Sequence, residues 1–266
     1  MTVRGSGPAV VLVHGIPGSA RTWDRVAEQL EDRFTVFTPD LLGVGGSDRP
    51  RDLRSLLAPA QAAALASALG SQGVEDATVV GHDFGGPVAL TLAGAAPGTV
   101  ARIALLATNA FPNTPIPMPI RAVTWPVAGT ALSRLLFSRP SLRMLLGQGT
   151  GIGAARLTAA SYLGDRGQVR SIRLVFAACL QRMEEVFTPV ERALRDWEGP
   201  AAVIWGERDP FFPVEQGERT AVLAGTRLIV LPGAGHFLPE ERPREVAEAI
   251  ARLVASSPGV RSGRAS

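Results

Sequence analysis

The chain has 266 residues, 46% of them hydrophobic and 19% charged, which is enough apolar material for a core and excludes an intrinsically disordered chain. Its 27 basic residues, all of them Arg, outnumber its 24 acidic residues only slightly, and a net charge of +3 over this length does not indicate a nucleic-acid partner. A single cysteine, Cys179, excludes an internal disulfide, and the lack of a signal peptide or of any apolar run of about 20 residues predicts a cytoplasmic protein that does not enter a membrane.

Short apolar runs rich in β-branched residues alternate along the chain with stretches of helical periodicity. The predicted strands are 10–13, 35–38, 78–80, 100–106, 201–205 and 227–231. The predicted helices between them are 20–30, 56–69, 87–96, 214–223 and 243–255. This alternation predicts an α/β fold, in which helices flank both faces of a mostly parallel central sheet.

The alternation stops between residues 111 and 196. This segment opens with the proline-rich sequence FPNTPIPMPI, which is typical of a linker. Helical patterns then follow without strands between them, at 122–137, 141–146, 154–163, 168–185 and 190–195. We therefore predict a core domain in two parts, 1–110 and 197–256, with a helical cap at 111–196 and a flexible polar tail at 257–266.

The segment that carries the clearest chemical signal is TVVGHDFGGPVAL, which runs from residue 78 to residue 90. It places Gly81-x-Asp83-x-Gly85 between a predicted strand and a predicted helix. That is the spacing of a nucleophile elbow, where the central side chain sits on a sharp strand-to-helix turn. Glycines allow neighbouring chain to pass close by, and the helix N-terminus favours a negative charge. A carboxylate, rather than a hydroxyl, therefore occupies the nucleophile position.

Three further motifs follow predicted strands. His14-Gly15-Ile16-Pro17 follows the first strand, Asp209 follows the strand at 201–205, and His236 follows the last strand. The order nucleophile, acid, histidine is that of the α/β-hydrolases, and the chain resembles this superfamily from about residue 10 to residue 255. The resemblance implies an α/β-hydrolase fold with an inserted helical cap. It leaves room for at most one of the two strands that usually precede the first strong strand.

An aspartate nucleophile narrows the reaction type. A carboxylate that attacks an sp³ carbon forms an alkyl ester, which water can cleave, whereas serine would form an ether. The sequence resembles the Asp-nucleophile branch of the superfamily, the epoxide hydrolases and haloalkane dehalogenases. The resemblance implies that Asp83 is the nucleophile, His236 the base that activates water, and Asp209 the acid that orients His236. The backbone N–H groups of Ile16 and Phe84 are the predicted oxyanion hole. No metal or cofactor is implied.

The leaving group distinguishes epoxide hydrolases from haloalkane dehalogenases. Halide release typically uses a Trp directly after the nucleophile and an Asn or Trp elsewhere, but this chain has Phe84 and Ile16 at the corresponding positions. The arginines of fluoroacetate-type dehalogenases are replaced by Phe84 and Pro87. Epoxide opening needs a proton donor in the cap, normally a pair of tyrosines, and the only tyrosine here is Tyr162. We therefore favour hydrolysis of an epoxide to a vicinal diol. Haloalkane dehalogenation, and a binding or non-hydrolytic role in a biosynthetic pathway, are the alternatives.

The substrate is predicted to be a small apolar molecule, and the sequence defines neither its identity nor the oligomeric state. It is expected to bind between the sheet and the cap, in a pocket with five apolar side chains in its wall: Trp125, Phe176, Phe211, Phe237 and Leu238. His14 and His82 are predicted to be structural, and Cys179, in an apolar helix, to be inert core.

Overall fold

A computed structural model of the chain describes residues 1–115, 121–122, 125, 128–136, 138–148 and 166–256. Within these residues one sheet of seven strands has the order β1-β3-β2-β4-β5-β6-β7. The strands are β1 (Thr2–Arg4), β2 (Ala9–Val13), β3 (Thr35–Thr38), β4 (Ala77–His82), β5 (Val100–Leu106), β6 (Ala201–Gly206) and β7 (Leu228–Leu231). Only β1 is antiparallel to its neighbour, β3, so the sheet is mostly parallel as predicted.

The sheet buries both of its faces, which explains why its strands are continuous apolar runs. In β2, Val11 and Val13 point into one core while Val10 and Leu12 point into the other, and all four are fully buried. Successive side chains of a strand alternate between the two faces, so a single short run supplies both cores. One strand, β1, precedes β2, which agrees with the prediction of at most one.

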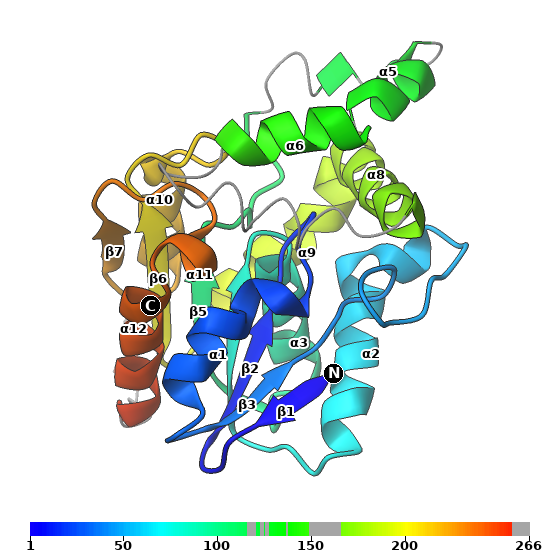
Figure 1. Cartoon of the computed structure of the whole chain (residues 1–266). Helices are drawn as coiled ribbons and strands as arrows, with labels where there is room; N and C mark the ends of the chain where they lie inside the picture. The colour runs from blue at the N-terminus through cyan, green and yellow to red at the C-terminus, as the bar shows by residue number, and fades with distance from the viewer. Residues whose placement is uncertain (116–120, 123–124, 126–127, 137, 149–165, 257–266) are drawn as a thin grey trace.

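Helices cover the sheet from both sides (Figure 1). One face packs against α2 (Ala58–Gly70), α3 (Gly85–Ala95), α9 (Met183–Asp196) and α10 (Val214–Leu223). The other packs against α1 (Asp24–Leu30), α11 (Leu238–Glu241) and α12 (Pro243–Ala255). Short 3-10 helices at Ala20–Trp23 and Arg54–Leu56 precede α1 and α2. The two predicted helices at 214–223 and 243–255 have the predicted bounds.

The regular elements described between β5 and β6 are helices, with α5 (Gly129–Leu136), α6 (Arg139–Gln148) and α8 (Arg166–Gln181) ahead of α9. In Figure 1, α5, α6 and α8 lie beyond the carboxyl ends of the strands, while α9 descends beside α3. Two predicted bounds here are wrong: α5 begins only at Gly129, and a break at Arg182 separates α8 from α9. The predicted helix at 154–163 and the predicted tail at 257–266 lie outside the described residues.

Helix α9 continues through Pro189, directly before the residue, Val190, at which the sequence predicted a new helix to begin. Pro189 lies inside α9, where it removes one backbone hydrogen bond. The helix is amphipathic, and its face formed by Val186, Val190 and Leu194 is buried in the core. Packing of this face compensates for the lost hydrogen bond.

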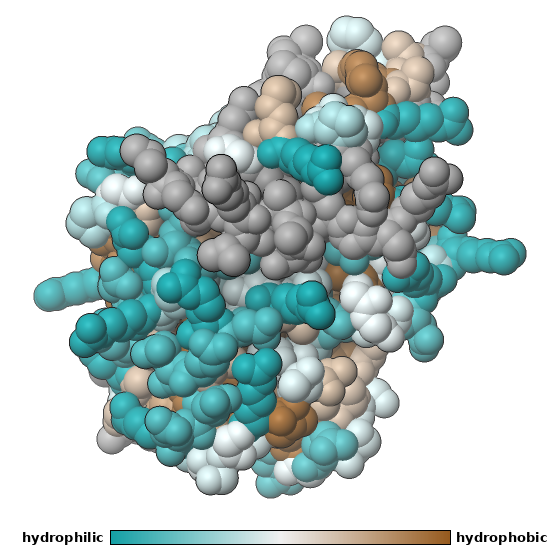
Figure 2. Space-filling view, in the orientation of Figure 1, coloured by the Kyte–Doolittle hydropathy of each residue, from teal (hydrophilic) through white to brown (hydrophobic). Residues whose placement is uncertain are grey.

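The surface over α1 and α12 is mostly hydrophilic, with small and scattered apolar areas (Figure 2). None of the helices in the described ranges has the length and apolarity that crossing a bilayer requires.

Candidate active site

The carboxyl ends of the parallel strands bring the predicted motifs to one edge of the sheet. Asp83 directly follows β4, which pairs with β2 on one side and β5 on the other. His14 follows β2, Asp209 follows β6, and His236 follows β7. Ligands of open α/β sheets bind at this edge, because the loops that follow the strands converge there.

The turn at Asp83 has the strained backbone expected of a nucleophile elbow. Its φ angle is +50°, in the left-handed region that non-glycine residues seldom adopt. A Cβ atom on Gly81 would overlap with the carbonyl of Gly85, so the sharp turn requires glycine at that position. The strand-turn-helix arrangement predicted from the glycine spacing is therefore present.

Neighbouring backbone and side-chain groups hold the strained turn. The Asp83 N–H donates to the carbonyl of Leu106 at 3.1 Å. The buried Thr108 hydroxyl donates to the Asp83 carbonyl at 2.5 Å, and the Gly86 N–H donates to the same oxygen at 3.0 Å. Thr108 is in turn tied to α10, since the Gln216 side-chain amide donates to its carbonyl at 3.0 Å.

Asp83, His236 and Asp209 form a triad. His236 Nδ1 lies 2.8 Å from Asp209 Oδ2, a hydrogen bond, and Nε2 lies 3.7 Å from Asp83 Oδ2, an ion-pair distance. The second oxygen of Asp209 accepts from the N–H groups of Phe211 and Phe212 at 2.8 and 3.0 Å. Because the Asp209 side chain is fully buried, these contacts orient it rigidly toward His236.

Two carboxylates around one imidazole set the charges of the site. Burial alone would lower the pKa of His236, but the charge and hydrogen bond of Asp209 and the nearby Asp83 outweigh burial and raise it to about 10. Burial alone would raise the pKa of Asp83, but the proximity of His236 and the Ile16 N–H hold it below its usual value. At neutral pH the resting site therefore holds His236 as an imidazolium beside an ionised Asp83.

The turn after β2 reaches the nucleophile from the other side. The Ile16 N–H donates to Asp83 Oδ1 at 2.7 Å, and a Cβ atom on Gly15 would overlap with the Asp83 side chain. Phe84 immediately precedes α3, so its N–H is among those that a helix leaves without an internal acceptor. Both predicted oxyanion-hole residues thus lie beside Asp83.

The two remaining histidines brace this region. His14 Nε2 accepts the Leu41 N–H at 3.0 Å, so Nδ1 carries the proton and donates to the Gly15 carbonyl at 2.8 Å. His82 donates from Nε2 to the His236 carbonyl at 2.9 Å. Burial lowers the pKa of both, that of His82 to about 4, so both are neutral.

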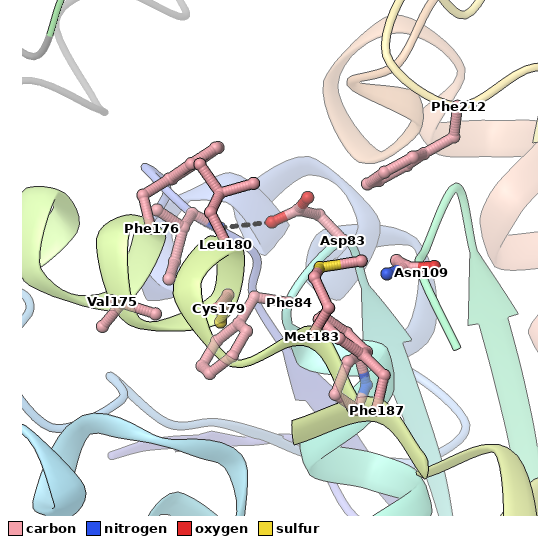
Figure 3. Close-up of a pocket in the computed structure, with 12 residues that line it drawn as sticks. Asp83, Phe84, Asn109, Val175, Phe176, Cys179, Leu180, Met183, Phe187 and Phe212 are labelled. Atoms are coloured by element: carbon pink, nitrogen blue, oxygen red, sulfur yellow. Dashed lines mark hydrogen bonds between the residues drawn. The ribbon is translucent and has the colours of Figure 1, made fainter. Parts of the chain in front are cut away.

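A mostly apolar cavity opens above Asp83, with about 550 Å³ of empty space including the part open to solvent. In Figure 3, the Asp83 carboxylate lies between Phe176 and Leu180 of α8 and the ring of Phe212. The remaining lining residues are Ile16, Phe84, Pro87, Asn109, Val175, Cys179, Met183 and Phe187.

Of the five predicted pocket residues, the cavity lining contains only Phe176 among the residues that the structure describes. The other four predictions need correction. The rings of Phe211 and Phe237 pack edge-on against His236, each with its centroid 5.0 Å from the imidazole. Leu238 is fully buried between the sheet and α12, and Trp125 is 52% exposed. The contacts with His236 hold the rings of Phe211 and Phe237, and the core beneath α12 takes up the Leu238 side chain. Tyr162 lies outside the described residues.

Sequence reasoning missed most of the α8 and α9 wall. Val175, Phe176, Cys179, Leu180 and Met183 recur at helical i, i+4 spacing, a signal that could have identified one face. Cys179, predicted to be inert core, lines the cavity, although burial and Asp83 raise the pKa of its thiol to about 12 and keep it protonated. Asn109 also lines the cavity, but its Oδ1 accepts from Phe111, Thr114 and Gln216.

The sequence was compared with models of protein families. Residues 10–249 match the model of the alpha/beta hydrolase family, a range that covers the parallel strands from Val10 onward, the elbow and the whole triad. The chain belongs to the alpha/beta hydrolase family.

Relatives of this alpha/beta hydrolase are distant. An uncharacterised protein of Mycobacterium tuberculosis is 30% identical over 95% of this chain and 76% of its own length. Epoxide hydrolase A of the same organism is 27% identical over 91% of this chain and 89% of its own length. A thermophilic esterase from Thermogutta terrifontis shares the fold, with a TM-score of 0.77 and 24% identity over 95% of this chain and 91% of its own. The chain is therefore a hydrolase by family, and its reaction has to be argued from the site.

Proposed function

We propose that this hydrolase opens an epoxide to a vicinal diol through a covalent ester on Asp83. The observation that carries the proposal is a carboxylate, not a hydroxyl, at the elbow, on the floor of an apolar cavity and with a His–Asp pair behind it. The similarity to epoxide hydrolase A over most of both chains supports it.

In the first step, Asp83 attacks a carbon of the epoxide ring. The Ile16 N–H engages Oδ1, which leaves Oδ2 as the attacking oxygen. A new C–O bond forms to Oδ2 as the ring C–O bond breaks, and the released alkoxide takes a proton from an acid. Tyr162 is our proposed donor. The pKa of Asp83, held below its usual value, keeps the nucleophile ionised.

In the second step, water cleaves the ester. His236 Nε2 removes a proton from a water molecule, whose oxygen attacks Cγ of Asp83. The negative charge then develops on Oδ1, where the Ile16 N–H, 2.7 Å away, and the Phe84 N–H stabilise it. The intermediate expels the diol alkoxide, which takes the proton back from His236. The diol leaves with the original Oδ2, and the oxygen of the water remains on Asp83. The second proton of the water passes from the Asp83 carboxyl group to His236, which restores the carboxylate and the imidazolium of the resting site.

Esterification of Asp83 also lowers the pKa of His236, the base of the second step. In the free enzyme the charges of Asp209 and Asp83 together hold the His236 pKa at about 10. The ester removes the charge of Asp83, so the imidazole loses one of its two anionic partners and its pKa falls. The imidazolium then gives up its proton, which restores the phenol of the proposed donor Tyr162, and neutral His236 becomes the base for the second step.

The leaving group favours an epoxide over a halide. Halide release is assisted by weak N–H donors, and the cavity wall in the described ranges contains no indole. The amide group of Asn109 is engaged by its neighbours, with Nδ2 donating to the Phe111 carbonyl at 3.2 Å.

The proposal is tested with styrene oxide and with labelled water. Wild-type enzyme should form the diol, and a single turnover in H₂¹⁸O should place the label on Asp83 rather than in the product. His236→Gln should accumulate an adduct of the mass of the epoxide, and Asp83→Ala should form none. Asp76→Ala is a matched control, because Asp76 also has a positive φ, +53°, but lies at the opposite end of β4. Halide release from 1-bromobutane without diol formation, or label in the first-turnover diol, would contradict the proposal.

A further inference from the structure

The backbone on both sides of His236 is held by one carboxylate. Glu241 accepts the Gly235 N–H on Oε2 at 2.9 Å and the Phe237 N–H on Oε1 at 3.1 Å. The two donors belong to the residues directly before and after His236. The two oxygens of a single side chain therefore bind the backbone on both sides of the histidine.

The position of Glu241 follows from the short helix α11. The N–H of Glu241 donates to the Phe237 carbonyl at 3.0 Å, and this single turn brings its half-buried side chain back over the loop that follows β7. A glutamate that reaches back to the start of its own helix is a common capping arrangement. Here the second oxygen extends beyond the cap to Gly235, on the other side of the histidine.

The carbonyl of His236 is also held by hydrogen bonds. It accepts from His82 Nε2 at 2.9 Å and from the Leu238 N–H at 2.9 Å. Rotation of the loop about the His236 backbone would break a contact to Glu241 or to His82. The position of the imidazole, 2.8 Å from Asp209, therefore depends on these backbone contacts as well as on its hydrogen bond to Asp209.

We infer that Glu241 is a positioning residue for His236 and that its contribution falls on the ester-cleavage step. This inference rests on the proposed covalent mechanism, in which His236 acts on water after Asp83 has already reacted. Glu241 is not among the residues that line the described cavity, and its charge is not among those that shift the pKa of Asp83. Loosening the loop should therefore leave formation of the ester intact and slow its hydrolysis.

The test separates the two steps in Glu241→Gln. The glutamine keeps the shape of the side chain, but its NH₂ group would face one of the two N–H donors. With styrene oxide, rapid-quench mass spectrometry should show ester formation within about twofold of wild type. Ester hydrolysis should be slowed at least about tenfold, as expected for a base displaced by a fraction of an ångström. Glu245→Gln, which makes the same change on a half-exposed side chain of α12, should leave both rates unchanged.

Equal slowing of both steps, or of neither, would overturn the role of Glu241. Glu241→Asp, which keeps the charge and shortens the side chain, provides the same comparison if the glutamine variant does not fold. The His236→Gln variant tests the covalent mechanism separately from the role of Glu241. If this variant accumulates no ester, the covalent mechanism itself fails.

A second readout needs no substrate. The Nδ1 proton of His236, hydrogen-bonded to Asp209, should give a downfield ¹H resonance in wild type and in Glu245→Gln. This resonance should shift or broaden in Glu241→Gln at an unchanged melting temperature. An unchanged resonance would refute positioning by Glu241, whatever reaction the enzyme catalyses.

Discussion

Neutralising Asp83 should lower the pKa of His236, and Asp83→Asn is the cleanest perturbation. Asparagine keeps the shape of the carboxylate and, like the proposed ester, carries no charge. Removing a negative charge beside an imidazolium disfavours the protonated form, so the pKa must fall rather than rise.

The magnitude follows from the separation of 3.7 Å between His236 Nε2 and Asp83 Oδ2. At an effective dielectric constant of about 20, two charges at this distance interact by about 4 kcal/mol. Since one pKa unit corresponds to about 1.4 kcal/mol, the upper limit is about three units. The Asp83 side chain is 15% exposed at the cavity, and solvent screening reduces the effect. We expect the His236 pKa to fall from about 10 by between about one and three units.

The assay is an NMR titration of the imidazole resonances. The chain has only three histidines, and burial lowers the pKa values of His14 and His82, so His236 alone should titrate above pH 7. Asp76→Asn serves as the control for an aspartate of similar backbone conformation away from the cavity. A His236 pKa in Asp83→Asn within about 0.3 units of wild type would refute the electrostatic argument, and with it the proposed activation of the base by esterification.

Two further predictions concern stability and the elbow. The folded-state pKa of His236, about 10, lies above 6.5, the ordinary value for a histidine side chain. The stabilisation that protonated His236 contributes is therefore complete below pH 6.5 and is lost as the pH rises through about 10. Chemical denaturation should show wild type losing stability relative to His236→Gln across this window, by at most about 5 kcal/mol; a constant difference would contradict the raised pKa. Thr108→Val removes the hydroxyl that donates to the Asp83 carbonyl and should cost about 1 kcal/mol of unfolding free energy and reduce ester formation, whereas Thr108→Ser should restore both. Equal activity in the valine and serine variants would show that this hydrogen bond does not hold the nucleophile.

Several elements were predictable because their signals are local. Doubly buried strands such as β5 are apolar runs that end where polar or small residues begin, and its predicted bounds match the structure. The elbow was predictable for the same reason: a turn in which a Cβ atom at Gly81 would overlap with the backbone demands glycine at a defined spacing. The order of Asp83, Asp209 and His236 after successive strands then placed the triad at one sheet edge, because parallel strands end on the same side.

The side-chain environment depended on tertiary packing. Phe211 and Phe212 are adjacent in the sequence and chemically identical, and both rings pack edge-on against His236, yet only Phe212 is among the residues that line the cavity. Their directions are set by the carboxylate of Asp209, which accepts both of their N–H groups. No periodicity in the sequence records such a turn.

The sequence by itself predicted the fold, because strand burial and glycine spacing are local patterns, and it predicted the three residues of the triad through the resemblance of its motifs and their order to the α/β-hydrolases. Only the tertiary structure decided the charges of the site and the support around it. The His236 pKa of about 10 arises from two carboxylates that lie 153 and 27 positions away in the chain. The two hydrogen bonds that Glu241 accepts beside His236 depend on one turn of α11 folding back over the loop that precedes it. Distances in space between residues far apart in sequence set these properties, and the linear pattern of residue types does not contain those distances.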